Sequence, residues 1–222
     1  KSIYECRKGF GLELAKESNA EADMVIPIPD SGVPSAIGYA EQAGIPFELG
    51  ITRNHYVGRT FIQPKQSIRS LGVRLKHNAN RTLVAGKRIV LIDDSIVRGT
   101  TSVKIVQMMR EAGAKESHFR VSSPPITHSD FYGIDTPSKD QLLASTKSVA
   151  EMCEYLGADS LAFLSIEGIY QALGHKDGRN ADCPQYTDHC FTGEYPTLLE
   201  DESGGELNSQ LSFLSMAEPH EH

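Results

Sequence analysis

Short apolar runs alternate with segments of helical periodicity over most of the chain. Residues 24–30, which read MVIPIPD, predict a strand that runs into a turn. Residues 89–92, IVLI, are apolar at every position, as a central strand of a parallel sheet requires because both of its faces are buried. The other predicted strands are 45–50, 118–123 and 160–165, and the predicted helices are 4–17, 33–43, 100–112, 149–156 and 166–173. Strands that alternate with helices indicate an α/β fold with a mostly parallel, doubly wound sheet.

This alternation is interrupted once and fades toward the end. Residues 52–77 contain two glycines, one proline and little periodicity, so they predict a long loop, and such loops in compact domains are usually functional or disordered. After Gly174 the periodicity is weak, and the last segment is polar enough to predict a flexible tail. We therefore divide the chain into a domain over residues 1–175, an extension over 176–200 and a tail over 201–222.

The composition is that of an ordinary soluble globular protein. The 222 residues are 39% hydrophobic and 23% charged, and no apolar run approaches the roughly 18 residues that a membrane-spanning helix needs. The first ten residues lack the apolar core of a secretory signal, so we expect a cytoplasmic protein with no membrane partner. The formal net charge of -7 argues against general nucleic-acid binding.

The charges are unevenly distributed along the chain. Residues 51–81 contain no Asp or Glu but seven cations. These cations are Arg53, Arg59, Lys65, Arg69, Arg74, Lys76 and Arg81. An all-cationic segment in an acidic chain indicates either a solvated basic loop or a segment that meets an anion, and the charge pattern alone does not decide between the two.

The strongest chemical signal is the segment 89–102, IVLIDDSIVRGTTS. A buried strand ends in two adjacent carboxylates, Asp93 and Asp94, and a short loop then opens a helix. The residues of this loop and helix start that can bind an anion are Ser95, Arg98, Gly99, Thr100 and Thr101. Ligands of open α/β sheets bind at the carboxyl ends of strands, and the N-terminus of a helix offers unpaired N–H groups to a phosphate.

Two carboxylates beside a phosphate cradle need partners of their own. Sugar hydroxyls and a divalent cation are the natural ones. The simpler alternative, an N-capped helix after a strand, explains Thr100 or Thr101 but neither the two acids nor Arg98. We therefore favour a ribose-phosphate site.

This segment resembles the phosphoribosyl pyrophosphate (PRPP) binding motif of type I phosphoribosyltransferases. Further segments resemble the amidophosphoribosyltransferases, also called glutamine PRPP amidotransferases. They are residues 26–32, 38–41, 56–64, 122–126 and 131–135. The resemblance runs from about residue 4 to residue 196, and the segments occur in the order of that family.

The resemblance implies a type I phosphoribosyltransferase fold and a Mg²⁺-dependent glycosyltransferase. The implied reaction transfers ammonia, made from glutamine in the full-length enzyme, to C1 of PRPP, which gives 5-phosphoribosylamine and pyrophosphate. This is the first step of de novo purine biosynthesis. The family also implies feedback inhibition by purine nucleotides, a homo-oligomer and a glutaminase domain in the same chain. Lys1 and Cys6 do not match that domain's N-terminal cysteine, so we expect this chain not to use glutamine.

The resemblance also assigns roles to individual residues. Asp93 and Asp94 hold the ribose hydroxyls and, with Ser31, the metal, while the loop and helix start that follow hold the 5-phosphate. Asp30, Ser31 and Gly32 form the turn at the pyrophosphate. The cationic segment corresponds to a flexible lid over PRPP. Its implied site residues are Tyr56, Arg59, Arg74 and Lys76, of which Lys76 is assigned to catalysis.

Some members of the family carry an iron–sulfur cluster on four cysteines. One of those positions lies upstream of the matched region, and the others are Asp130, Thr187 and Cys190 here, so we predict no cluster. Cys183, His189 and Cys190 are a weak alternative metal site. Two other functions stay open from the sequence: a different PRPP-dependent phosphoribosyltransferase, and a non-catalytic regulator of this fold that senses nucleotides.

Overall fold

A computed structural model describes residues 1–54 and 77–197, and its centre is a four-stranded parallel sheet. The strands are β1 (Met24–Pro27), β4 (Arg88–Asp93), β5 (Glu116–Val121) and β6 (Ser160–Phe163), in the spatial order β1-β4-β5-β6. Leu91 of β4 lies opposite Ile26 of β1 and opposite Phe119 of β5. The predicted parallel α/β fold is therefore confirmed.

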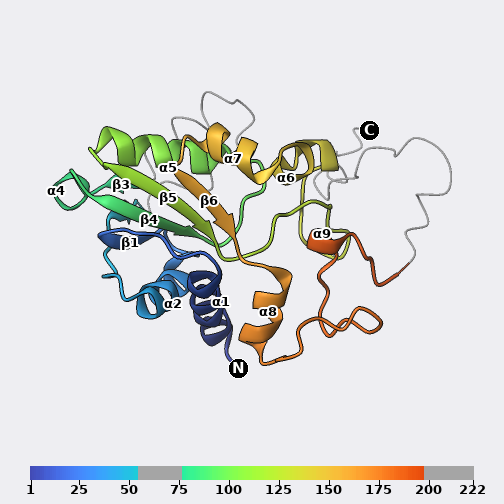
Figure 1. Cartoon of the computed structure of the whole chain (residues 1–222). Coiled ribbons are helices and arrows are strands. Elements are labelled where there is room, and N and C mark those ends of the chain that lie inside the picture. Colours follow the sequence, from blue (N-terminus) through green and yellow to red (C-terminus); the bar gives the residue numbers. More distant parts are fainter. Residues whose placement is uncertain (55–76, 198–222) are drawn as a thin grey trace, which may run out of the picture.

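Helices cover both faces of the sheet. In Figure 1, α1 (Ile3–Glu17), α2 (Val33–Ala43) and α8 (Ile166–Leu173) lie below the sheet, and α5 (Thr100–Glu111) and α7 (Val149–Leu156) lie above it. The side chains of β4 alternate between these layers: Ile89 and Leu91 belong to the α5 side of the core, and Val90 and Ile92 belong to the α1–α2 side. This alternation explains why the strand is apolar at every position.

Local capping signals fix several of these helices. Ser2 and Glu5 form a capping box at the start of α1, and Ser148 and Glu151 form another at the start of α7. Each box satisfies backbone N–H groups that the first turn of a helix leaves unpaired. The helix over 33–43 has the predicted bounds.

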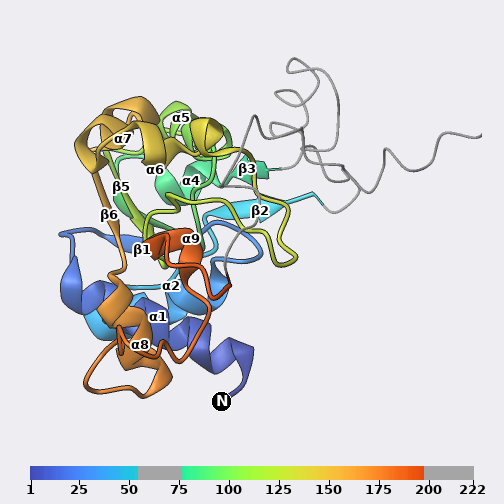
Figure 2. The same ribbon diagram turned by 90° about the vertical axis from the view of Figure 1, so that its right-hand side faces the viewer.

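A second, two-stranded sheet was not predicted. β2 (Ile51–Arg53) pairs antiparallel with β3 (His77–Ala79), and Figure 2 shows the two strands side by side. The predicted loop over 52–77 therefore begins and ends in strands, and its residues 55–76 lie outside the described residues. The strand predicted at 45–50 is wrong: only Phe47 forms a bridge, to Val25 of β1. Pro46 has no amide hydrogen to continue the pairing.

Four short helices complete the described elements. They are α4 (Arg81–Val84), η2 (Lys139–Gln141), α6 (Leu143–Thr146) and α9 (His189–Thr192). Within residues 1–54 and 77–197, no helix combines the length and the apolar character needed to span a membrane.

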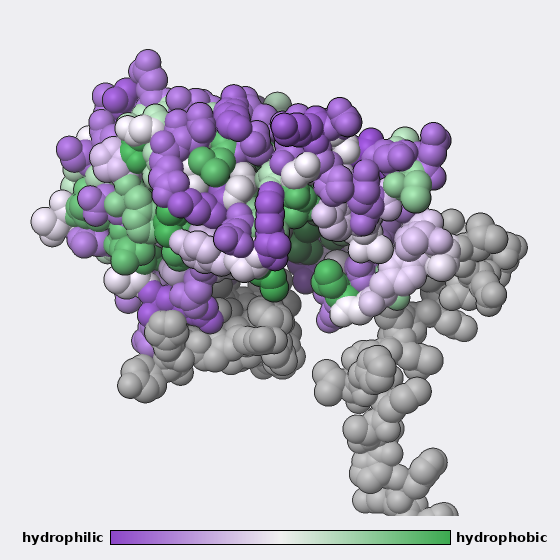
Figure 3. Space-filling model, turned by 90° about the horizontal axis from the view of Figure 1, so that it is seen from below, coloured by the Kyte–Doolittle hydropathy of each residue, from purple (hydrophilic) through white to green (hydrophobic). Residues whose placement is uncertain are grey.

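The face formed by α1, α2 and α8 is largely hydrophilic, with apolar side chains in smaller areas between (Figure 3).

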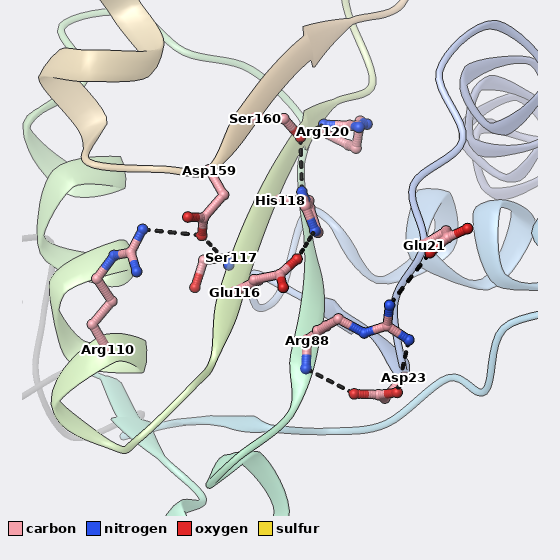
Figure 4. A network of polar contacts seen from close by, with 10 residues as sticks. All are labelled: Glu21, Asp23, Arg88, Arg110, Glu116, Ser117, His118, Arg120, Asp159 and Ser160. Atoms are coloured by element: carbon pink, nitrogen blue, oxygen red, sulfur yellow. Dashed lines mark hydrogen bonds and ion pairs between the residues drawn. The ribbon is translucent and has the colours of Figure 1, made fainter.

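A polar network holds the amino-terminal edge of the sheet, opposite the end described below as the site (Figure 4). The backbone amide of Arg88 donates to Asp23 at 2.8 Å, and its guanidinium also contacts Asp23. Asp159 accepts hydrogen bonds from the Ser117 amide at 2.7 Å and from Arg110 at 3.0 Å. The partly exposed ion pairs each contribute little, about 0–1 kcal/mol. The backbone amides of Arg88 and Ser117, at the starts of β4 and β5, bind the carboxylates of Asp23 and Asp159 and so join these strands to neighbouring segments.

The C-terminal extension is attached to the sheet domain by buried polar groups. Asp188 accepts hydrogen bonds from Arg179 at 2.6 Å and from the Tyr170 hydroxyl of α8 at 2.8 Å. His189 contacts the buried carboxylate of Asp130 at 2.8 Å. The division of the chain at residue 175 stays a prediction, and the predicted tail lies outside the described residues.

Candidate active site

The carboxyl ends of β1 and β4 lie side by side and bring two turns together. Pro27 is opposite Ile92, and the amide of Ile28 donates to the carbonyl of Ile92 at 2.8 Å. The turn after β1 comes so close to β4 that a Cβ on Gly32 would lie 2.4 Å from the Ile92 carbonyl oxygen. Only glycine fits at that distance. The structure thus places the predicted turn 30–32 beside the predicted acidic pair.

The two carboxylates at the end of β4 have different surroundings. Asp93 is 8% exposed, and its Oδ1 accepts a hydrogen bond from the Asp94 amide at 2.9 Å. Burial, and then the negative charge of Asp94, raise the pKa of Asp93 well above its usual value. Asp94 is half-buried and accepts a long hydrogen bond from the Ser95 hydroxyl. A bound cation or hydroxyl donor would offset the cost of ionising this pair.

The loop over 95–99 leads into the N-terminus of α5. Gly99 is the residue before the helix, with φ of 73°, and no side chain caps the first turn. Thr100 and Thr101 are exposed. The first amide groups of a helix have no partner inside the helix, so this end of α5 can bind an anion through backbone N–H groups and the threonine hydroxyls.

One cation of the all-cationic segment reaches the turn after β1. Arg53, at the end of β2, forms an ion pair with Asp30 through its Nη1 atom. This pair balances the negative charge of Asp30 in a turn predicted to meet an anion. Tyr56, Arg59, Arg74 and Lys76 lie outside the described residues, so the structure does not place them.

Comparison with known proteins decides the family. The family described as the phosphoribosyl transferase domain matches residues 12–123, a range that contains both turns of the site. The chain belongs to the phosphoribosyltransferase family.

The chain is similar to several amidophosphoribosyltransferases. The protein from Rhizobium etli is 61% identical over 216 residues, which are 97% of this chain and 43% of that protein. The one from Bacillus subtilis is 55% identical over 198 residues, which are 89% of this chain and 41% of that protein. The chain spans less than half the length of these relatives. The resemblance read from the sequence is confirmed.

The solved structures agree with this relationship. The glutamine PRPP amidotransferase of B. subtilis, complexed with ADP and GMP, matches with a TM-score of 0.78 and 54% identity. The match covers 89% of this chain and 43% of that one. The chain therefore has the fold of the matched part of that amidotransferase.

The described part of the chain has no preformed metal site made by protein side chains alone. No group of three or more His, Cys, Asp or Glu side chains there could hold a metal ion. The alternative site of Cys183, His189 and Cys190 is therefore wrong, and His189 is instead held by Asp130 at 2.8 Å. Asp93 and Asp94 supply oxygen ligands of the kind that Mg²⁺ accepts when substrate phosphates provide the rest.

Two residues beside the loop over 95–99, the phosphate loop of the predicted site, were missed in the sequence. The Leu143 amide donates to the Val97 carbonyl at 2.8 Å, and Gln141 accepts hydrogen bonds from the Arg98 guanidinium. Leu143 also closes the space at Gly99, where a Cβ would lie 2.7 Å from its Cδ2. These contacts join residues more than 40 positions apart, and no local pattern signals them.

Proposed function

We propose that this chain transfers ammonia to C1 of PRPP and releases pyrophosphate, giving 5-phosphoribosylamine, the first step of de novo purine biosynthesis. The observation that carries the proposal is the acidic pair Asp93–Asp94, which lies beside the turn over 30–32 and is joined by the short loop over 95–99 to the N-terminus of α5, where no side chain caps the helix. The names of the relatives support ammonia as the acceptor, because they are amidophosphoribosyltransferases.

The geometry suits a ribose phosphate in one orientation. The 5-phosphate binds at the start of α5, where the amides and hydroxyls of Thr100 and Thr101, with Arg98, meet its charge. The ribose hydroxyls then face Asp93 and Asp94, which accept their hydrogen bonds. C1 of the ribose points toward the turn over 30–32, where the amide groups after Asp30 meet the pyrophosphate.

The site offers Mg²⁺ the oxygen ligands that this ion prefers. Asp93, Asp94 and the hydroxyl of Ser31 are the residues that would hold it, together with the pyrophosphate oxygens. The buried carboxylate of Asp93 supports this, because no cationic side chain forms an ion pair with it among the described residues. When bound, the ion neutralises charge that develops on the leaving pyrophosphate.

The chemical step is a displacement at C1. The lone pair of ammonia forms the C–N bond while the bond from C1 to the pyrophosphate oxygen breaks, with inversion at C1. Positive charge on the ribose in the transition state is stabilised by the carboxylates of Asp93 and Asp94. Ammonia is already a nucleophile, so no general base is needed, and the new ammonium group loses its proton to solvent. We assign Lys76, with Tyr56, Arg59 and Arg74, to the leaving group and the approach of ammonia.

The wider assembly is also a proposal. We infer that the natural protein joins this chain to a glutaminase domain that supplies ammonia, forms a homo-oligomer and works in the cytoplasm. ADP and GMP in the B. subtilis structure support purine nucleotides as its inhibitors.

A turnover assay tests the proposal. The chain is incubated with PRPP, Mg²⁺ and ammonium salt, and pyrophosphate release is measured against the same mixture with glutamine or with free nucleobases as the nitrogen source. We expect release with ammonia and none with glutamine. Release with a nucleobase alone would show a different phosphoribosyltransferase, and binding of PRPP without any turnover would show a regulator.

A further inference from the structure

Gln141 contacts the arginine of the phosphate loop directly. Its Oε1 atom accepts hydrogen bonds from Nε of Arg98 at 3.2 Å and from Nη2 at 2.9 Å. The two residues are 43 positions apart in the chain, and Gln141 is the last residue of η2. One oxygen that receives two N–H groups of a planar guanidinium fixes the orientation of that group as well as its position.

The backbone around Gln141 is held in place independently of this contact. The Leu143 amide donates to the Val97 carbonyl at 2.8 Å. Leu142, directly after Gln141, has 0% exposure, and Leu143 is also buried. Gln141 is itself exposed, but the backbone that carries it is held in place, so its side chain lies beside Arg98.

The acceptor is neutral, and this matters for the charge of the loop. Among the ion pairs of the described residues, none involves Arg98. A glutamine carbonyl orients the guanidinium and leaves its positive charge uncompensated. A glutamate would orient the guanidinium and also neutralise its charge. Gln141 is the acceptor of the Arg98 side chain among the described residues, so within that part of the chain the Nη1 group and one N–H of Nη2 are left for a further acceptor.

We propose that Gln141 is a positioning residue that orients Arg98 toward the 5-phosphate of the substrate. The inference rests on the proposed function, since it needs a sugar phosphate at the start of α5. An unrestrained arginine loses much side-chain freedom when it binds an anion, and an orientation that exists before binding reduces that loss. Gln141 acts on binding through Arg98 and does not itself touch the substrate.

A double-mutant cycle on the 222-residue chain tests this, with ribose 5-phosphate as the probe and isothermal titration calorimetry as the measurement. We expect Gln141→Met, which keeps the length of the side chain but removes the acceptor, to weaken binding about three- to tenfold. In an Arg98→Met background the same change should have no further effect, because the group it orients is gone. Gln171→Met, on an exposed site of α8, is the matched control and should bind like wild type.

A second variant separates orientation from simple support of the fold. Gln141→Glu keeps the acceptor but places a carboxylate beside Arg98 and near the phosphate, so we expect weaker binding than wild type with an unchanged melting temperature. The inference is overturned if Gln141→Met binds as tightly as wild type, if its effect persists without Arg98, or if Gln141→Glu binds like wild type. If the wild-type chain binds neither ribose 5-phosphate nor PRPP, the proposed function itself fails, which is a different result.

Discussion

Ser122 anchors the carboxyl end of β4 through the backbone of Asp93. The Ser122 amide donates to the Asp93 carbonyl oxygen at 2.9 Å, and the Ser122 hydroxyl donates to the same oxygen at 3.2 Å. The strand end is thus held by two hydrogen bonds from Ser122, the residue after β5, to the backbone of Asp93, and neither of them uses the carboxylate of Asp93. The acidic pair can therefore be changed without removing the contacts that form the strand end.

Replacing Asp93 and Asp94 together by Asn should leave the fold intact and remove activity. Burial and the charge of Asp94 raise the pKa of Asp93 in the folded state, so Asp93 lowers stability at pH values above its unfolded-state pKa, and the double variant should melt at the same or a higher temperature. Ammonia-dependent pyrophosphate release should fall at least about 100-fold. Asp177→Asn, at an exposed site, serves as the control. A large drop in melting temperature with near-normal turnover would show that the pair is structural.

Gly99→Ala should cost more stability than the same change at another left-handed glycine. Gly44 has φ of 69°, and no atom lies within 4 Å of the position that a Cβ would take. Gly44→Ala should therefore lower the free energy of unfolding only through backbone strain, by about 1–2 kcal/mol. At Gly99, with φ of 73°, the new Cβ also meets Leu143 at 2.7 Å, which should add about 1–3 kcal/mol. Urea unfolding measures both, and equal losses would contradict the close contact between Leu143 and the phosphate loop.

The attachment of the C-terminal extension should depend on pH. Burial acts to raise the pKa of Asp188, but hydrogen bonds from Arg179 and Tyr170 outweigh it and lower the pKa below the ordinary 3.8. A lowered pKa in the folded state stabilises the protein above the unfolded-state value, and this contribution is lost as pH falls through the folded-state value. Asp188→Asn should therefore cost about 3 kcal/mol at neutral pH.

The difference between Asp188→Asn and wild type should shrink in acid, below the unfolded-state value of Asp188. Denaturant unfolding of both proteins at several pH values measures this difference in the free energy of unfolding. Asp177→Asn, in the same segment but exposed, should match wild type throughout. A loss for Asp188→Asn that stays constant into acid would mean that the charge of Asp188 does not hold the extension.

The chain should contain no iron–sulfur cluster when purified anaerobically. The position that corresponds to one cluster cysteine is Asp130, which is buried and contacts His189 at 2.8 Å. Iron–sulfur clusters are held by cysteine thiolates, and a buried carboxylate that is already hydrogen-bonded to His189 does not supply one. The expected protein is colourless, and broad visible absorption with stoichiometric iron would refute the prediction.

The sequence predicted the elements whose signals are local. The run IVLI is apolar on both faces because it forms a central parallel strand, and the helix over 33–43 begins and ends where the sequence placed it. The acidic pair and the helix start were found for the same reason, since strand, loop and helix follow one another directly. The strand predicted over residues 45–50 was wrong because the segment is apolar enough to resemble a strand, although it pairs with β1 only at Phe47.

The parts that were missed depend on contacts between distant segments. Gln141 acquires its role only when η2 is folded against the loop after β4, and an isolated glutamine in a polar segment gives no sign of it. The pairing of Arg53 with Asp30 likewise requires β2 to end beside the turn after β1. β2 itself has three residues, too few for a periodic pattern to be read.

A crystal structure of the chain with ribose 5-phosphate tests the central claim most directly. The account predicts that the phosphate oxygens lie within hydrogen-bond distance of the amides of Thr100 and Thr101, and that the ribose hydroxyls face Asp93 and Asp94. A sugar phosphate bound elsewhere, with no contact to the start of α5, would contradict it.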